Sequence, residues 1–292
     1  MQTETKGMLY GLLGVCVFGL TLPVTRIVVP YMDPIFIGMG RAVVAAILAI
    51  AMLVVFRQPL PNRKQFIQLI WVALGVVIGF PVFSSWAMQY VPAAHGGVVL
   101  GILPLATAIA GAIINHERPS LAFWVVGIVG SMIVVGYSLI QGAGHIHVAD
   151  FALLAAIICA ALGYAVGGKL SKELGGWQVI CWALIVALPV AIYPTLSYAP
   201  TSFSNIPLSG YVSFFYLSIM SQFLGFFVWY KGLALGGIAR VSQVQLLQPF
   251  ITLIASIAFL REAIDMQTFI FVCLVVVSVW IGKKMPIEHK LK

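Results

Sequence analysis

Long apolar runs separated by short polar segments fill almost the whole chain. Each run holds about 20 apolar residues, the length that an α-helix needs to cross the hydrocarbon core of a bilayer. Helices are expected because a helix satisfies its backbone hydrogen bonds within one segment. The pattern therefore predicts an all-α integral membrane protein with ten transmembrane helices. The predicted spans are Gly7–Val28, Pro34–Val55, Phe66–Ala87, Ala93–Ile114, Leu121–Ile140, Asp150–Lys169, Trp177–Ser197, Tyr211–Tyr230, Ile238–Phe259 and Met266–Gly282.

The fourth and ninth spans resemble each other. Each has a proline near its middle and a glutamate just past its end. A shift of 145 positions places Ala94 on Ala239, Pro104 on Pro249, Thr107 on Thr252 and Glu117 on Glu262. With five spans in each half, the second copy must enter the membrane upside down. The sequence thus predicts two inverted five-helix repeats, residues 1–143 and 144–292, an arrangement typical of secondary transporters.

Composition agrees with a membrane location. The 292 residues are 62% hydrophobic and 8% charged, whereas soluble domains carry about 25% charged residues. The mean hydropathy is +1.08. The net charge of +8 comes from basic residues spread over many short connections. These form no basic patch, so a nucleic-acid partner is not expected; the expected partners are the lipid bilayer and a small-molecule substrate.

Basic residues lie mostly on one side of the predicted topology. Lys and Arg accumulate in cytoplasmic loops, and a cytoplasmic N-terminus leaves only Arg26 and Arg261 outside, with Arg41 inside a span. The expected location is the cytoplasmic (inner) membrane, with both termini in the cytoplasm. The residues then placed on the cytoplasmic side are Lys6, Arg57, Arg63, Lys64, Arg118, Lys169, Lys172, Lys231, Arg240, Lys283, Lys284, Lys290 and Lys292.

Motifs of enzymes and of ATP-driven pumps are missing from the sequence. The segment Asn115–Arg118 lacks the second histidine of a zinc HExxH motif, and no GxSxG or Walker loop occurs. His145 and His147 are too few for a metal site. We therefore expect no enzyme activity, no metal and no cofactor. The four cysteines lie among apolar residues of the spans and predict no disulfide.

The chain resembles the drug/metabolite transporter superfamily, in particular its EamA-type carriers of ten spans in two five-span repeats. The resemblance implies that spans one to four and six to nine enclose the substrate site, while spans five and ten lie outside. It also implies amino acids or related compounds as substrates. The matching residues are Phe18, Gly19, Pro23, Arg26, Pro34, Arg41, Pro104, Glu117, Arg118, Gly127, Gly130, Gly136, Leu162, Gly163, Tyr164, Ala165, Lys169, Pro249 and Glu262.

Polar residues within the spans are the candidates for binding. Arg41 lies inside span two, where an arginine is costly; it either binds a substrate carboxylate or makes structural contacts. Glutamine in a bilayer needs another helix or a wet cavity as its partner. We expect Arg41, three glutamines, one serine and two aromatic residues to line the cavity. The alternative for the glutamines and the serine is that they lock helices together. The candidates are Arg41, Trp86, Tyr164, Gln222, Ser242, Gln245 and Gln248.

Prolines and glycines predict how the helices bend and approach. Pro104 and Pro249 each remove a backbone hydrogen bond, and their equivalent places in the repeats favour a gating or hinge role over a passive kink. His95 and Arg240 are also equivalent, at opposite faces, and are expected at the interfaces. Four glycine pairs at four-residue spacing predict close helix contacts: Gly7 and Gly11, Gly75 and Gly79, Gly97 and Gly101, Gly163 and Gly167.

Together these features predict a secondary transporter that exports a small organic metabolite, with amino acids as the leading class, by alternating access. No acidic residue lies near the centre of a span, which favours facilitated or exchange transport over proton coupling. An ion-coupled symporter, a multidrug or cation exporter, a channel and a scaffold subunit remain as alternatives. The carrier is expected to be a monomer or a homodimer.

Overall fold

A computed structural model describes residues 2–115, 117–140, 148–260, 266–285 and 287–289. Its elements in the first half are α1 (Gln2–Gly19), α2 (Thr21–Val28), α3 (Pro34–Val55), α4 (Arg63–Val72), η1 (Ala73–Gly79), α5 (Phe80–Ala87), α6 (Ala93–Val99), η2 (Leu100–Ile102), α7 (Leu103–Asn115), β1 (Glu117–Pro119) and α8 (Leu121–Ile140). Those in the second half are α9 (Val148–Leu174), α10 (Gly176–Ser197), α11 (Leu208–Phe215), η3 (Tyr216–Leu224), α12 (Gly225–Gly236), α13 (Ile238–Ser242), η4 (Gln243–Leu247), α14 (Gln248–Leu260), α15 (Met266–Lys284) and β2 (Ile287–His289).

The prediction of an all-helical membrane protein is confirmed. Within the described residues, eight helical segments are long and apolar enough to cross a membrane, and α8 and α15 occupy the places of spans five and ten. Several spans extend beyond their predicted limits; the sixth runs to Leu174 rather than Lys169. The strands β1 and β2, which were not predicted, have three residues each and pair antiparallel, with Arg118 opposite Glu288.

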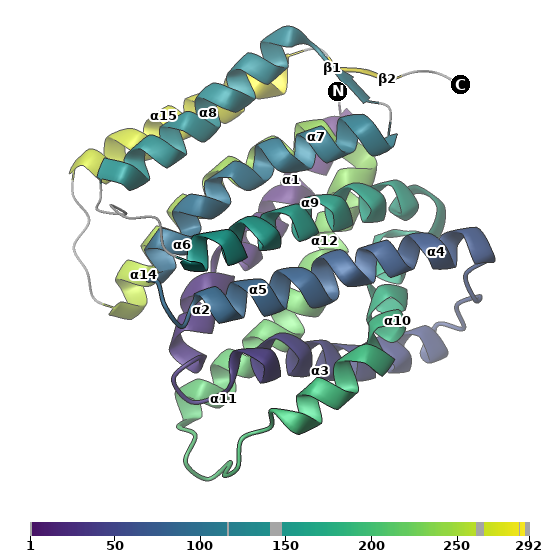
Figure 1. The fold of residues 1–292 in the computed structure, drawn as a ribbon. Coiled ribbons are helices and arrows are strands. Elements are labelled where there is room, and N and C mark those ends of the chain that lie inside the picture. The colour runs from purple at the N-terminus through teal and green to yellow at the C-terminus, as the bar shows by residue number, and fades with distance from the viewer. Residues whose placement is uncertain (1, 116, 141–147, 261–265, 286, 290–292) are drawn as a thin grey trace.

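The central helices pack in pairs, and each pair contains one helix from each half. Helix α1 contacts α12, α9 contacts η1 and α5, and α3 contacts α10. In each case the first helix of one half meets the third helix of the other, or the two second helices meet. Helices α8 and α15 pack on each other along one edge of the bundle (Figure 1). This agrees with the implied position of spans five and ten outside the helices that enclose the site.

Glycines allow close crossings at two equivalent places in the repeats. A Cβ atom added at Gly232 of α12 would lie 2.8 Å from the backbone nitrogen of Gly11 and the carbonyl oxygen of Gly7 in α1. At the equivalent crossing, one added at Gly75 would lie 2.6 Å from the carbonyl oxygen of Cys159 and 3.0 Å from Gly163 in α9. The predicted close contacts at Gly7, Gly11, Gly75 and Gly163 are confirmed, because backbone approaches backbone there.

Replacing Gly232 by alanine is expected to lower stability by about 1–3 kcal/mol, since the α1 and α12 backbones must separate to admit a methyl group. Thermal unfolding of the purified protein in detergent measures the loss. Gly136→Ala in α8 is the matched control, because a Cβ there meets no described atom within 4 Å and alanine favours the helix by about 1 kcal/mol. Equal melting temperatures for the two variants would contradict the close crossing.

Candidate functional site

Arg41 lies buried in the middle of the bundle. Helix α3 begins at Pro34 with Asp33 as its cap, whose carboxylate accepts a hydrogen bond from the Ile35 amide at 2.7 Å. Two turns later, Arg41 is 1% exposed. Its Nε donates to Oε1 of Gln222 at 2.9 Å, while its Nη1 has no hydrogen-bond partner in the described part of the chain. A charged group therefore lies among apolar helices with a donor still available.

Gln222 is held by a backbone carbonyl that a proline leaves without its usual partner. In the π-helix η1, the amide of Phe80 bonds to the carbonyl of Gly75, five residues back. The carbonyl of Val76 would take the next bond, but the residue five positions on is Pro81, which has no N–H. Nε2 of Gln222 donates to that carbonyl at 3.1 Å. The side chain of Gln222 thus connects η1 in the first half to Arg41.

A second proline creates a similar contact on α1 and α2. The helix breaks at Leu20, between α1 and α2, and Pro23 cannot donate to the carbonyl of Gly19. Oγ1 of Thr252 in α14 donates to that carbonyl at 2.7 Å. Next to the break, the hydroxyls of Thr21 and Ser221 lie 2.8 Å apart. Polar side chains of the second half therefore complete the broken helix of the first half.

These contacts surround a small cavity between the two halves. Its lining residues are Phe18, Thr21, Arg41, Val76, Phe80, Tyr164, Ser221, Phe226 and Gln248. The cavity volume is about 10 Å³, which is about the room that one water needs. The cavity has a guanidinium, hydroxyls and an amide on aromatic walls. A metabolite can enter it only after the surrounding helices move apart.

The structure brings some predicted site residues together and not others. Arg41, Tyr164 and Gln248 line the cavity, and Gln222 bonds to Arg41. Gln245 is 1% exposed and neither polar atom of its amide has a partner in the described part of the chain, but it is not a lining residue.

Two more predicted residues are absent from the lining. Ser242 donates to the carbonyl of Ala239 within its own helix. Trp86 packs on Tyr90, with ring centroids 4.8 Å apart and ring planes tilted by 54°.

Sequence reasoning did not find Thr21, Val76 and Phe226 as lining residues. Thr21 lies between Gly19 and Pro23, two residues that break helices, and this local pattern could have indicated an irregular backbone near the cavity. The role of Val76 depends on Pro81 and on a side chain from the other half, so nothing near it in the sequence indicates it.

Pro104 and Pro249 both follow a short 3-10 turn. The turn η2 lets the Leu103 amide bond to the carbonyl of Leu100, the group that Pro104 leaves without an α-helical donor. In η4, the Gln248 amide bonds in the same way to the carbonyl of Gln245 before Pro249. Local 3-10 adjustment is one way in which membrane helices satisfy backbone groups freed by proline. The two spans thus share one irregularity, at equivalent positions.

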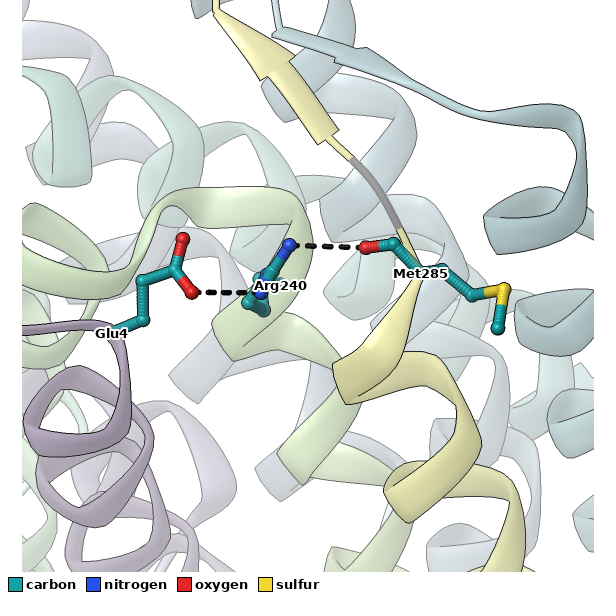
Figure 2. A network of polar contacts seen from close by, with 3 residues as sticks. All are labelled: Glu4, Arg240 and Met285. Atoms are coloured by element: carbon teal, nitrogen blue, oxygen red, sulfur yellow. Dashed lines mark hydrogen bonds and ion pairs between the residues drawn. The ribbon is translucent and has the colours of Figure 1, made fainter. Parts of the chain in front are cut away.

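Ion pairs lie at the two ends of the bundle. Figure 2 shows Arg240 between Glu4 and Met285: Nη1 is 2.8 Å from Oε2 of Glu4, and Nη2 donates to the carbonyl of Met285 at 3.0 Å. At the opposite end, Nε2 of His95 lies 2.5 Å from Oδ1 of Asp150.

The two ion pairs are related by the repeat. The 145-residue shift superimposes His95 on Arg240, and Asp150 lies one residue from the position equivalent to Glu4. Each pair joins the start of the fourth helical span of one repeat to the start of the first span of the other. His145, His147, Arg261 and Glu262 lie outside the described residues.

A bundle of apolar helices in two equivalent halves, with a polar cavity between them, defines a membrane transporter. The sequence matches the EamA-like transporter family over residues 5–140 and again over residues 147–281. The chain belongs to this family, so it is a transporter and not an enzyme. The resemblance found in the sequence is confirmed, and each half corresponds to one family repeat.

Relatives and one solved structure agree with this classification. The chain is 44% identical to the uncharacterized transporter YdeK of Bacillus subtilis over 90% of this chain and 92% of that protein. It is 24% identical to a probable terminal-alkyne amino-acid exporter of Streptantibioticus cattleyicolor, over 63% of this chain and 61% of that protein. A crystal structure that is 16% identical superimposes with a TM-score of 0.76, covering 95% of this chain and 98% of the other, and supports the fold alone.

Thr252→Val is expected to destabilise the protein by about 1 kcal/mol, because it leaves the Gly19 carbonyl without a donor. Thr107→Val is the matched control: Thr107 occupies the equivalent position and is also buried, but its hydroxyl donates to Leu103 within the same helix. Chemical or thermal unfolding in detergent measures both. A loss in Thr107→Val as large as in Thr252→Val would show that the contact between the halves adds nothing.

Proposed function

We propose that this chain exports a small carboxylate-bearing metabolite, an amino acid or a related compound, by alternating access of two repeats comprising residues 1–143 and 144–292. The observation that carries the proposal is the cavity between the repeats, where the buried Arg41 has an unused donor, Nη1. A guanidinium recognises a carboxylate through charge-assisted, often bidentate, hydrogen bonds. The cavity is complete within one chain, so the proposed unit of transport is the monomer.

Individual residues receive separate roles in this proposal. Arg41 binds the carboxylate, and Gln222 fixes the guanidinium through Nε. Gln248, whose Oε1 has no partner in the described part of the chain, orients a polar group of the substrate. Tyr164 and the phenylalanines of the lining hold its apolar part. Gln245 extends the polar path when α14 moves, while Pro104 and Pro249 are the points at which the fourth and ninth spans bend.

The two ion pairs are the proposed gates. Breaking Glu4–Arg240 frees the first and ninth spans at one face, and breaking His95–Asp150 frees the fourth and sixth spans at the other. Because the pairs join equivalent helices of inverted repeats, opening one corresponds by symmetry to opening the other on the opposite side. Rocking between two such arrangements around a fixed central site is the usual mechanism of inverted-repeat carriers.

We propose that the protein lies in the cytoplasmic (inner) membrane, with the face that contains Glu4 and Arg240 toward the cytoplasm. The basic residues described at this face outnumber the one at the opposite face, Arg26, in agreement with the positive-inside rule. Those at the face with Glu4 are Lys6, Arg57, Arg63, Lys64, Lys169, Lys172, Lys231, Arg240 and Lys284.

Counterflow in proteoliposomes tests the transport function. Preloading with an unlabelled carboxylate, either an amino acid or an N-acylated amino acid, is expected to accelerate saturable uptake of the same labelled compound, because a loaded carrier returns faster than an empty one. Arg41→Gln and Gln248→Ala are expected to reduce uptake at least tenfold, the effect of losing about 1.4 kcal/mol of charged or buried hydrogen bonding. Trp86→Phe, outside the lining, is the control. Normal counterflow in Arg41→Gln would remove Arg41 from the site, and flux without saturation would indicate a channel.

Charge reversal tests the gates. In a background with the four cysteines replaced by alanine, S221C places a thiol on the cavity wall. R240E puts two carboxylates together and is expected to raise labelling of this thiol by an impermeant maleimide from the face with Glu4 about fivefold, as a shift of about 1 kcal/mol would give. The double variant E4R/R240E restores the opposite charges and is expected to restore slow labelling. Fast labelling in the double variant would contradict a gate made by this pair.

A further inference from the structure

Among the described residues, the cavity contains a positive charge with no acidic side chain to balance it. Arg41 is 1% exposed, and its described contact is with the neutral amide of Gln222. None of the described residues that line the cavity is acidic. The described carboxylates of Glu4, Asp33, Asp150 and Glu173 lie at helix ends. The guanidinium stays charged at any physiological pH, so the empty site carries one positive charge.

We infer that the site selects substrates with a net charge of −1, and that transport is electrogenic and driven by the membrane potential. This inference rests on the proposed function and specifies its substrate class and driving force. A monoanion neutralises the buried charge when it binds. A zwitterionic amino acid brings an ammonium group into the same cavity, where hydroxyls and an amide are available but no carboxylate. Its second charge is desolvated without a counter-ion, which disfavours it.

The charge balance fixes what the membrane potential does. When a monoanion is bound, the site is neutral while the carrier switches from inward-open to outward-open. The empty carrier then switches back with the positive charge of Arg41 unbalanced. Each cycle therefore moves one negative charge in the direction of substrate transport. A potential that is negative inside the cell favours net export, since a charge that crosses the membrane gains free energy in proportion to the potential.

No coupling ion is needed in this scheme. A proton or a sodium ion usually binds an intramembrane carboxylate, and all eight acidic residues of the sequence lie at or beyond the ends of the expected spans. The potential alone supplies both the driving force and the direction of net flux. Export against a concentration gradient is then possible for an anion, whereas a neutral solute on the same carrier only equilibrates.

Three derivatives of one amino acid test the charge rule. At pH 6, N-acetyl-L-phenylalanine, L-phenylalanine and L-phenylalaninamide carry −1, 0 and +1 with the same aromatic side chain, which suits the aromatic walls. Proteoliposomes receive a tenfold higher potassium concentration outside than inside, and valinomycin makes the interior positive. The labelled anion is expected to accumulate about tenfold inside at steady state, the ratio that balances this gradient for one charge. Without valinomycin its ratio is about one. Accumulation at steady state does not depend on the orientation of the carrier, and protein-free vesicles correct for leakage.

Variants connect the result to Arg41. R41Q removes the charge and is expected to lower uptake of the N-acetyl compound at least tenfold, with R41K retaining more activity than R41Q. Both variants are used only where their thermal unfolding matches that of the wild type.

Two results would overturn the inference. Saturable L-phenylalanine counterflow that valinomycin does not alter, with no accumulation of the N-acetyl compound, would reject the charge rule while leaving the carrier function intact. Absence of uptake and counterflow for all three compounds would reject carboxylates at this site, and with them both the charge rule and the proposed function.

Discussion

Inside a lipid bilayer, every backbone carbonyl needs a hydrogen-bond donor from the protein, because no bulk water is present to supply one. This requirement explains the contacts at the centre of the protein. Pro23 and Pro81 each leave a carbonyl without its helical N–H. Thr252 donates to Gly19, and Gln222 donates to Val76. Both donors come from the second half and both acceptors from the first. Side chains of one repeat therefore complete the irregular backbone of the other, and the cavity lies among these contacts.

The same constraint has a second solution at the fourth and ninth spans. Before Pro104 and Pro249, a 3-10 turn supplies the missing donor from within the helix. These two spans are thus complete in themselves and do not depend on the opposite repeat at their prolines. The helices around the cavity are joined across the repeats, while the fourth and ninth spans are independent at their bends. This division agrees with the proposal that the fourth and ninth spans bend at their prolines.

Inverted symmetry relates the two ends of the bundle but leaves them chemically different. The equivalent positions hold a histidine at one face and an arginine at the other, each beside a carboxylate. Arg240 also binds a backbone carbonyl of the segment after α15 (Figure 2), so its contact links the core helices to the tenth span. The centre is asymmetric too, since Arg41 comes from the first half and Gln222 from the second.

Hydrophobic runs and the 145-residue repeat were enough to predict ten helices, their order and their inverted halves, because spanning length and backbone satisfaction are local requirements. Sequence also indicated Arg41, Tyr164, Gln222 and Gln248 as polar or aromatic residues in unusual places. Which of them face one cavity was decided by the tertiary structure. Trp86 and Ser242 are also an aromatic and a polar residue within predicted spans. However, Trp86 packs on Tyr90, and Ser242 donates a hydrogen bond within its own helix. The π-helix at Ala73–Gly79 likewise depends on a donor 146 residues away. Pairing between distant helices is fixed by packing of the whole bundle, and no local pattern contains that information.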